Sequence, residues 1–193
     1  MQQQIDAHFL RHAQVLEAVR TSLAPAIEKC VECLVSALRN GNKVLIMGNG
    51  GSAADAQHFA AELVGRFLRE RRALPAIALT TDTSLLTAVG NDFGFEQIFS
   101  RQIEALAESG DVVIGLSTSG NSRNVALAME KARQKGCLTI GLLGRDGGAI
   151  APLVDVPLTI AVPETPHIQE AHITIIHLLC DLVEQQVCAG EVP

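Results

Sequence analysis

Residues 43–52 read KVLIMGNGGS, and this stretch decides the fold. Its first half is a continuous apolar run, which is typical of a strand buried on both faces of a parallel sheet. Its second half is rich in glycine, which lets the backbone turn tightly, and a helical pattern begins directly after it. A buried strand that turns into a helix is the repeating unit of α/β proteins. The stretch therefore predicts a parallel sheet covered by helices.

The same alternation continues to the end of the chain. Further apolar runs that we interpret as strands lie at residues 75–80, 111–117, 137–143 and 156–162. Helical patterns lie at residues 2–20, 24–39, 52–68, 84–89 with 95–108, 122–135 and 147–153. A last helix is predicted to run to about Val187, with Thr165 as its cap and Pro166 in its first position. We expect one α/β domain of three layers, with a five-stranded parallel sheet of the flavodoxin-like type.

The length, composition and net charge limit the classes of function that the chain can have. The chain has 193 residues, 48% of them hydrophobic, and a formal net charge of −6. An acidic chain has no overall basic field, so we predict no nucleic-acid partner. There is no apolar stretch of about 18 residues, and the first residues lack a basic segment followed by an apolar run. These features predict a cytoplasmic protein without a membrane partner.

The five cysteines do not indicate a disulfide framework, because their number is odd and the chain is long for one. Cys30 and Cys33 form a CxxC pair inside a helical pattern, with no second pair elsewhere. We expect them to be buried thiols rather than a zinc or redox site.

Two polar loops follow the first and third predicted strands. The first is GNGGS at residues 48–52, and the second is STSGNS at residues 117–122. Each leads into a helix, whose N-terminus offers free amides and the positive end of the helix dipole. Either loop alone also fits a plain strand-to-helix turn. Two such loops at neighbouring strand ends, one of them rich in hydroxyls, favour a phosphate-binding site.

Two helical faces carry candidate acid–base or metal-binding residues. His58 and Glu62 are four residues apart, and Gln169, Ile173 and His177 follow an i, i+4, i+8 stripe. Two imidazoles, a carboxylate and an amide oxygen suit zinc. Taken alone, each element is more typical of helix packing or of a hydrogen-bonded core histidine. His172 competes locally with His177 for either role.

These motifs together resemble the sugar isomerase (SIS) domain, over about residues 40–187, and within it the phosphoheptose isomerases. The resemblance rests on the two loops, on HFAAEL at residues 58–63 and on HIQEAHITIIH at residues 167–177. It implies a zinc ion held by His58, Glu62, Gln169 and His177. It implies substrate contacts from Asn49, Gly50, Gly51, Ser52, Glu62, Asn91, Asp92, Ser117, Thr118, Ser119, Ser122 and Gln169. Some relatives have an acidic residue before the Arg-Ile-Gln-Glu run, where this chain has Pro166 and His167; we assign no role to nearby Glu164.

The resemblance also implies a reaction. A phosphoheptose isomerase converts sedoheptulose 7-phosphate into D-glycero-D-manno-heptose 7-phosphate, the first step toward ADP-heptose for lipopolysaccharide or other surface glycans. The proton moves between C1 and C2 through an enediol, which needs a base, an acid and stabilisation of oxyanion charge. Glu62 is the candidate base and His177 the candidate acid. Because a zinc-bound carboxylate is a poorer base, the sequence leaves open which residue plays which part.

Three other functions fit parts of the sequence. A non-catalytic SIS adaptor, similar to the replication initiator-associating protein, would lack the glutamate and the final histidine that this chain has at Glu62 and His177. A sugar-phosphate-sensing regulator would need a basic helix-turn-helix, and none precedes the domain. An isomerase of another phosphosugar, such as a hexulose phosphate, stays open.

The N-terminal helices predict assembly. Apolar residues repeat at helical spacing in both stretches before the first strand, and burying both stripes within one chain is the simpler alternative. By the resemblance, we expect residues 1–40 to serve oligomerisation and residues 41–190 to form the SIS domain. The expected assembly is a homotetramer with active sites shared between chains.

Overall fold

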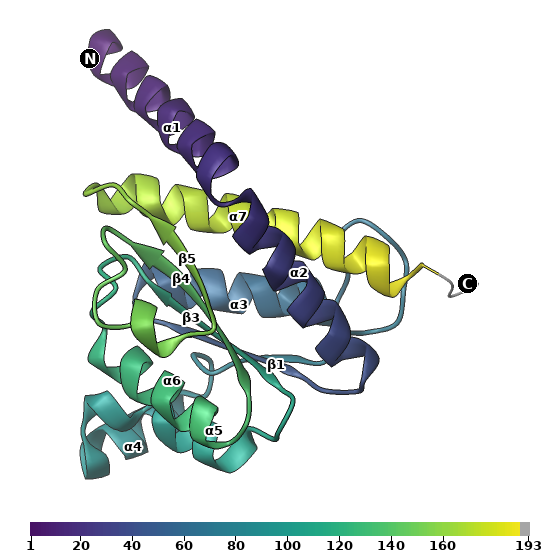
Figure 1. The fold of residues 1–193 in the computed structure, drawn as a ribbon. Helices are drawn as coiled ribbons and strands as arrows, with labels where there is room; N and C mark the ends of the chain where they lie inside the picture. The colour runs from purple at the N-terminus through teal and green to yellow at the C-terminus, as the bar shows by residue number, and fades with distance from the viewer. Residues whose placement is uncertain (190–193) are drawn as a thin grey trace.

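The computed structural model describes residues 1–189 and contains a five-stranded, all-parallel sheet (Figure 1). The strands are β1 (Val44–Gly48), β2 (Ala76–Ala78), β3 (Val112–Ser117), β4 (Leu138–Gly144) and β5 (Val156–Ile160). Their order is β2-β1-β3-β4-β5, which is the flavodoxin-like order. The predicted sheet and its three-layer class are confirmed. The predicted end of the domain at residue 190 lies outside the described residues.

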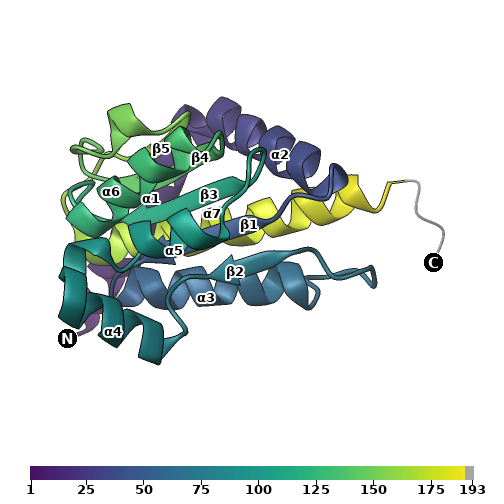
Figure 2. The same ribbon diagram turned by 90° about the horizontal axis from the view of Figure 1, so that it is seen from below.

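Helices cover both faces of this sheet (Figures 1 and 2). On one face pack α2 (Ala24–Arg39), α3 (Gly51–Val64) and α7 (Thr165–Val187). On the other lie α4 (Thr83–Phe93), α5 (Ser100–Leu106) and α6 (Arg123–Gln134), with short 3-10 turns at Phe95–Gln97 and Ala151–Leu153. Alternate residues of β1 point into the two cores: Val44 and Ile46 into the first, Leu45 and Met47 into the second.

The topology explains why the two polar loops lie together. β1 pairs directly with β3, with Gly48 opposite Leu116. The helix after β1, α3, packs on one face of the sheet, whereas the helix after β3, α6, packs on the other. Connections that leave neighbouring strands toward opposite faces open a crevice at the carboxyl edge of the sheet.

Several predicted element boundaries are wrong, and glycine explains two of them. Residues 147–153 form a turn and a 3-10 helix rather than an α-helix, because Gly147 and Gly148 have φ angles of 80° and 51°. Gly94, at φ 89°, separates α4 from the segment that leads to α5. The α3 helix ends at Val64, earlier than predicted.

The last helix begins as predicted, but its cap was assigned wrongly. Thr165 is the first helical residue, and Glu164 occupies the N-cap position. The side chain of Glu164 makes no capping bond; it accepts two hydrogen bonds from Arg11 of α1 instead, at 3.1 and 3.0 Å. We predicted Thr165 as the cap because a hydroxyl side chain is typical there. The residue at the N-cap position is Glu164, whose side chain forms an ion pair with α1 instead of capping the helix.

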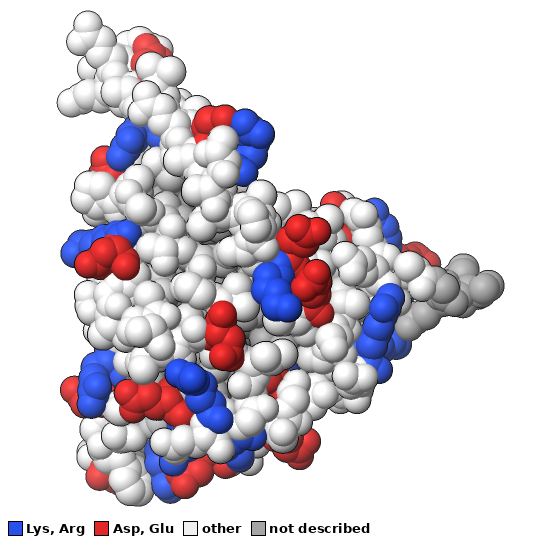
Figure 3. Space-filling view, viewed as in Figure 1, with Lys and Arg blue, Asp and Glu red and all other residues white. Residues whose placement is uncertain are grey.

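The N-terminal helix α1 (Gln2–Ser22) projects from the body (Figure 1). The apolar stripe of α2 is buried within the chain, so for this helix the simpler alternative holds. In α1 only Val15 and Val19 are buried, whereas Ile5, Phe9 and Leu10 are 46%, 68% and 64% exposed. Figure 3 shows α1 as an arm on which uncharged residues predominate.

Two further features of the described residues bear on function. None of the helices in residues 1–189 has the length and apolar character that a membrane crossing needs. Cys30 and Cys33 are buried in α2, as predicted, and burial raises the pKa of Cys30 to about 12. A thiol that resists ionisation is a poor metal ligand and a poor redox centre.

Candidate active site

The glycine loop connects β1 to α3. Gly50 has φ 58° and stands at the N-cap of α3, a conformation that residues with a Cβ rarely adopt. Gly51 is required for a different reason. A Cβ added at Gly51 would overlap the amide of Gln169, which packs against this loop from α7. Gly51 thus allows one predicted site residue to lie beside another.

The hydroxyl loop brings three serines together at the end of β3. Ser117 Oγ lies 2.9 Å from Ser122 Oγ and 3.4 Å from Ser119 Oγ. The turn is stabilised by the backbone N–H of Asn121, which donates to Ser119 Oγ at 3.1 Å. Ser117 is buried, and Ser119 and Ser122 are half-buried. Convergent neutral hydroxyls at a helix N-terminus match a phosphate group without burying a charge.

An amide pair joins the two loops. Asn49 Nδ2 donates to Asn124 Oδ1, and Asn124 Nδ2 donates to Asn49 Oδ1, each at 2.9 Å. Asn124, which is buried in the first turn of α6, was not predicted from the sequence. The pair fixes the glycine loop against the hydroxyl loop, so the two present one continuous surface.

A second group of predicted residues meets between α3 and α7. The Nε2 atoms of His58 and His177 lie 2.9 Å apart, so one ring donates a hydrogen bond and the other accepts it. His58 Nε2 is also 3.5 Å from Glu62 Oε1, one helical turn further along α3. The side chain of Glu62 is 22% exposed, which leaves its carboxylate accessible.

These distances test whether the group fits zinc. Tetrahedral zinc with bonds of about 2.0–2.1 Å places its ligand atoms about 3.3 Å from one another. The observed 2.9 and 3.5 Å lie on either side of that value. Two imidazoles and a carboxylate are donors that zinc prefers, so the donor types of His58, Glu62 and His177 fit this ion. Both distances are measured from His58, and the three ligand atoms do not all lie within 4.8 Å of one another, so Glu62 and His177 would have to move closer together to share an ion.

Gln169 does not lie in that group. The helices α3 and α7 run in the same direction, because Gln169 lies beside Gly51 and His177 lies beside His58. Glu62 is eleven residues beyond Gly51, which corresponds to about 16 Å along a helix. Within one chain, Gln169 therefore lies near the glycine loop, and its role as fourth zinc ligand stays a prediction.

Asp55 lies between the two groups on α3. Burial raises the pKa of Asp55, while a hydrogen bond from Gln169 and the nearby His58 ring act in the opposite direction. Its Oδ2 atom is buried without a hydrogen-bond partner among the described residues. Asp55 thus interacts both with the side-chain amide of Gln169 at the glycine loop and with the His58 ring.

A buried carboxylate on α7 anchors the chain segment that packs against the ring of His177. Glu184, whose side chain is 1% exposed, accepts hydrogen bonds from the backbone N–H groups of residues 67–69 at 2.8–3.0 Å. Arg71 lies 3.1 Å from the same carboxylate. Burial raises the pKa of Glu184, but these bonds and the Arg71 charge outweigh it, so the pKa falls below its usual value. The anchored segment presents Phe67, whose ring stacks on His177 at 5.6 Å.

Three other residues are placed away from both groups. Asn91 and Asp92 lie exposed in the last turn of α4, where Asn91 Nδ2 donates to Asp92 Oδ1 at 2.8 Å. His172 is fully buried and lies 3.3 Å from the carbonyl oxygen of Leu143. Burial lowers the pKa of His172 to about 4. His172 is therefore a core residue and does not compete with His177.

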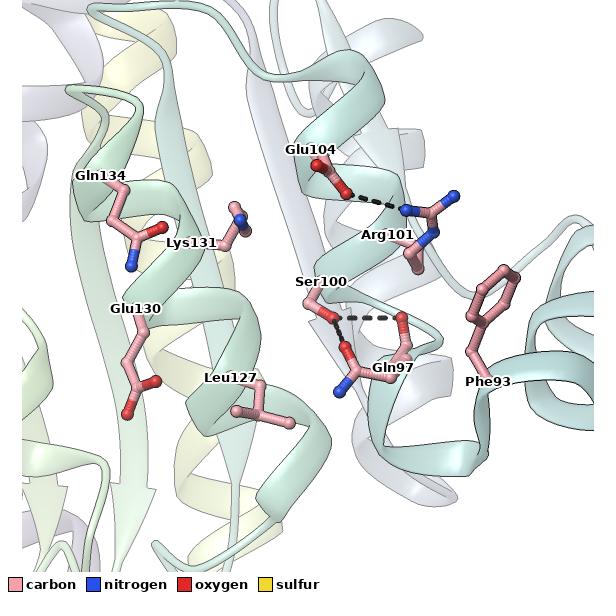
Figure 4. A pocket seen from close by; sticks show the side chains of 9 residues that line it. All are labelled: Phe93, Gln97, Ser100, Arg101, Glu104, Leu127, Glu130, Lys131 and Gln134. Carbon is pink, nitrogen blue, oxygen red and sulfur yellow. Dashed lines mark hydrogen bonds and ion pairs between the residues drawn. The ribbon is translucent and has the colours of Figure 1, made fainter.

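Two cavities differ in how close they lie to the predicted site residues. One of about 170 Å³ is bordered by the glycine loop, Thr80 and Phe95. A larger one of about 480 Å³ lies between α5 and α6 (Figure 4). Two of its charged lining residues, Arg101 and Glu104, form an ion pair with each other at 3.1 Å. It contains none of the predicted residues and does not border either polar loop.

No role was assigned to Asn124 or Glu184 from the sequence, although Glu184 could have been found from its spacing. Asn124 is the second residue of its helix, where an asparagine usually has no special role. Glu184 carried a signal that the sequence analysis missed: it is seven residues after His177, so it lies on the same face, and that face is otherwise apolar.

Comparison with known proteins agrees with this geometry. Residues 8–144 match the SIS domain family model. A phosphoheptose isomerase of Geotalea uraniireducens is 64% identical over 184 residues, covering 95% of this chain and 97% of the relative. The solved structure of a phosphoheptose isomerase from Neisseria gonorrhoeae superposes with a TM-score of 0.90 at 45% identity, covering 95% of this chain and 98% of that one. The corresponding structure from Francisella tularensis gives a TM-score of 0.92 at 40% identity, covering 95% and 97%.

The matches span nearly the whole of each chain, so they take in most of the N-terminal helical segment as well as the sheet. They bear out the resemblance that the two loops and the two helical faces indicated. The chain belongs to the SIS domain family and, within it, to the phosphoheptose isomerases, which are aldose–ketose isomerases.

Proposed function

We propose that this chain converts sedoheptulose 7-phosphate into D-glycero-D-manno-heptose 7-phosphate in the cytoplasm, as the first step of ADP-heptose biosynthesis for lipopolysaccharide or other surface glycans. The observation that carries the proposal is the group formed by His58, Glu62 and His177. A non-catalytic SIS adaptor would not need a carboxylate beside a facing pair of imidazoles. The names of the relatives support the choice of a heptose phosphate.

The chemistry divides between the two parts of the site. The serines at the end of β3 bind the phosphate, with the glycine loop beside them. Glu62 removes the proton from the carbon next to the carbonyl, and His177 protonates or deprotonates the oxygens as the enediol forms and collapses. Phe67, stacked on His177, holds the ring in the orientation that this transfer needs.

His58, Glu62 and His177 would hold a zinc ion, and Gln169 is the predicted fourth ligand. When bound, zinc acts as a Lewis acid that stabilises negative charge on the carbonyl and hydroxyl oxygens. The chain itself still has to supply the base. Glu62, whose carboxylate is 3.5 Å from His58 and 22% exposed, is the residue that would accept the proton.

The substrate is tested by a direct comparison. Purified protein is given sedoheptulose 7-phosphate or fructose 6-phosphate, and aldose phosphate is measured in each case. We expect turnover of the heptulose phosphate and little of the hexulose phosphate. Preference for the hexulose phosphate would make the chain an isomerase of a different sugar, and no turnover of either would favour the adaptor function.

Replacing Ser119 by alanine is expected to weaken substrate binding. The change removes one of three converging hydroxyls, which costs roughly 1–3 kcal/mol and raises KM about tenfold, with a smaller effect on kcat. Ser84→Ala, at an exposed position at the start of α4, is the matched control. Unchanged KM in alanine variants of Ser117, Ser119 and Ser122 would mean that the phosphate binds elsewhere.

We further propose that α1 assembles the protein into a homotetramer, as the resemblance to phosphoheptose isomerases implies. The exposed Ile5, Phe9 and Leu10 form an apolar face on a projecting helix. A groove of about 380 Å³ between α2 and α7 has a largely apolar lining that includes Ile27, Val31, Leu178 and Leu182. An apolar helix face and an apolar groove on the same chain are complementary surfaces for a second copy.

Phe9→Glu is expected to dissociate the assembly, because it places a charge in the centre of the apolar face of α1. Gln14→Glu adds the same charge elsewhere on α1 and should leave the mass unchanged. Light scattering measures both. A wild-type chain that is active as a monomer at assay concentration would contradict the proposal, as would a Phe9→Glu protein of unchanged mass.

A further inference from the structure

The contact between α1 and α7 contains a cluster of three histidines around one carboxylate, separate from the group at His58. His8 and His12 come from α1, and His167 and Glu170 come from α7. Glu170 Oε1 lies 3.1 Å from His8 Nε2, and Glu170 Oε2 lies 2.8 Å from His12 Nδ1 and 2.9 Å from His167 Nδ1. The rings of His8 and His167 are 4.6 Å apart. These four residues belong to neither part of the candidate active site.

Local structure explains why the four side chains meet. His8 and His12 are four residues apart on α1, and His167 and Glu170 are three apart on α7, so each pair shares one helical face. The guanidinium of Arg11 donates two hydrogen bonds to the carboxylate of Glu164, at 3.1 and 3.0 Å, and this ion pair holds the two helices next to each other. The cluster is therefore held between two anchored elements rather than on a loop.

The cluster has the geometry of a metal site. Ligand atoms of His8, His167 and Glu170 all lie within 4.8 Å of one another. Zinc in a tetrahedral site spaces its ligand atoms about 3.3 Å apart, so the observed contacts need to open by only a few tenths of an ångström. Burial raises the pKa of Glu170, but hydrogen bonds from His167, His12 and His8 outweigh it. The net pKa of Glu170 is therefore below its usual value.

The surroundings give the site a closed side and an open side. The side chain of His167 is 8% exposed, whereas that of His8 is 49% exposed. A cation can enter past His8, and water can complete the coordination there. His12 contacts Oε2 of Glu170, the oxygen that His167 also contacts, and such supporting hydrogen bonds orient a carboxylate ligand.

We propose that this chain binds a divalent transition metal of the zinc class at His8, His167 and Glu170, with His12 positioning the carboxylate. Imidazole and carboxylate donors select zinc and its neighbours over magnesium or calcium. The bound ion ties the projecting α1 to α7. This site does not depend on the proposed activity, because it shares no ligand with His58, Glu62 and His177.

The test isolates the second site by removing the first. Full-length His58→Ala/His177→Ala protein is stripped with a chelator and titrated with Zn²⁺ by calorimetry. We expect about one equivalent to bind, and none after Glu170→Gln or His8→Ala is added. Gln14→Ala, an exposed change on the same helix, should bind as the parent does. A second readout is thermal unfolding, which zinc should shift upward in the parent and not in the Glu170→Gln protein.

Two results would overturn the site. The first is no zinc binding by the parent at millimolar zinc. The second is binding that persists after Glu170→Gln and His8→Ala, which would place the ion elsewhere. If the parent does not fold, the same changes are made in wild-type protein, where zinc per chain should fall from two to one; an unchanged stoichiometry there contradicts the proposal.

Discussion

Glu62→Gln is expected to lower kcat at least ~10²-fold, the usual scale for loss of a general base. Glutamine keeps the size of the side chain and its place beside His58, 3.5 Å away in the wild type, but it cannot accept the substrate proton. The measurement is steady-state turnover of sedoheptulose 7-phosphate. Since Glu62 is only half-buried, the variant should fold normally, which circular dichroism checks.

A matched control separates this effect from a general loss of charge. Glu32→Gln removes an exposed carboxylate from α2 and should leave kcat within error. A Glu62→Gln protein with near-normal kcat would remove Glu62 from the mechanism, and the base would have to be sought on another residue.

Removing bound metal is expected to abolish turnover, and zinc should restore it. The reason is that His58, Glu62 and His177 have the donor types that zinc prefers and meet around His58, and a zinc ion would stabilise oxyanion charge. Protein is treated with a chelator, metal content is measured, and the rate is followed as zinc is added back. Metal-free protein that retains its full rate would leave these residues as a purely organic acid–base group.

The two metal sites are told apart in the same experiment. His8→Ala removes a ligand of the site between α1 and α7 without touching the site at His58. Chelated His8→Ala protein should therefore recover activity with about one equivalent of zinc. Recovery that fails in this variant but succeeds in wild type would mean that the ion between α1 and α7 is the one that activity needs.

Much of the fold was predictable because the signal is local. Residues 44–48 carry no polar side chain and show no alternation, and that pattern has few explanations other than a strand covered on both faces. The glycine loop directly after it and the hydroxyl loop after β3 then follow from the rule that parallel sheets bind ligands at their carboxyl edge. The pairing of β1 with β3 is what makes these loops neighbours.

What could not be predicted depends on contacts between distant segments. The ion pair of Glu164 with Arg11 and the exposure of Phe9 are decided by how α1 packs on α7, which no local pattern contains. The same holds for the amide pair of Asn49 with Asn124, 75 residues apart in the chain. Gln169 is the clearest example. The helical face on which it lies was predictable, but its position beside Gly51 could be known only once the relative direction of α3 and α7 was known.

The central claim is that proton transfer at Glu62 isomerises a heptulose phosphate. Its most direct test is NMR of the aldose product formed in D₂O by wild-type and Glu62→Gln protein. We expect the wild-type product to carry solvent deuterium at C2, because Glu62 takes a proton from C1 of the ketose, exchanges it with D₂O and returns a deuteron to C2 of the enediol. The variant is expected to form almost no product. Product without deuterium at C2, formed equally by both proteins, would contradict the claim.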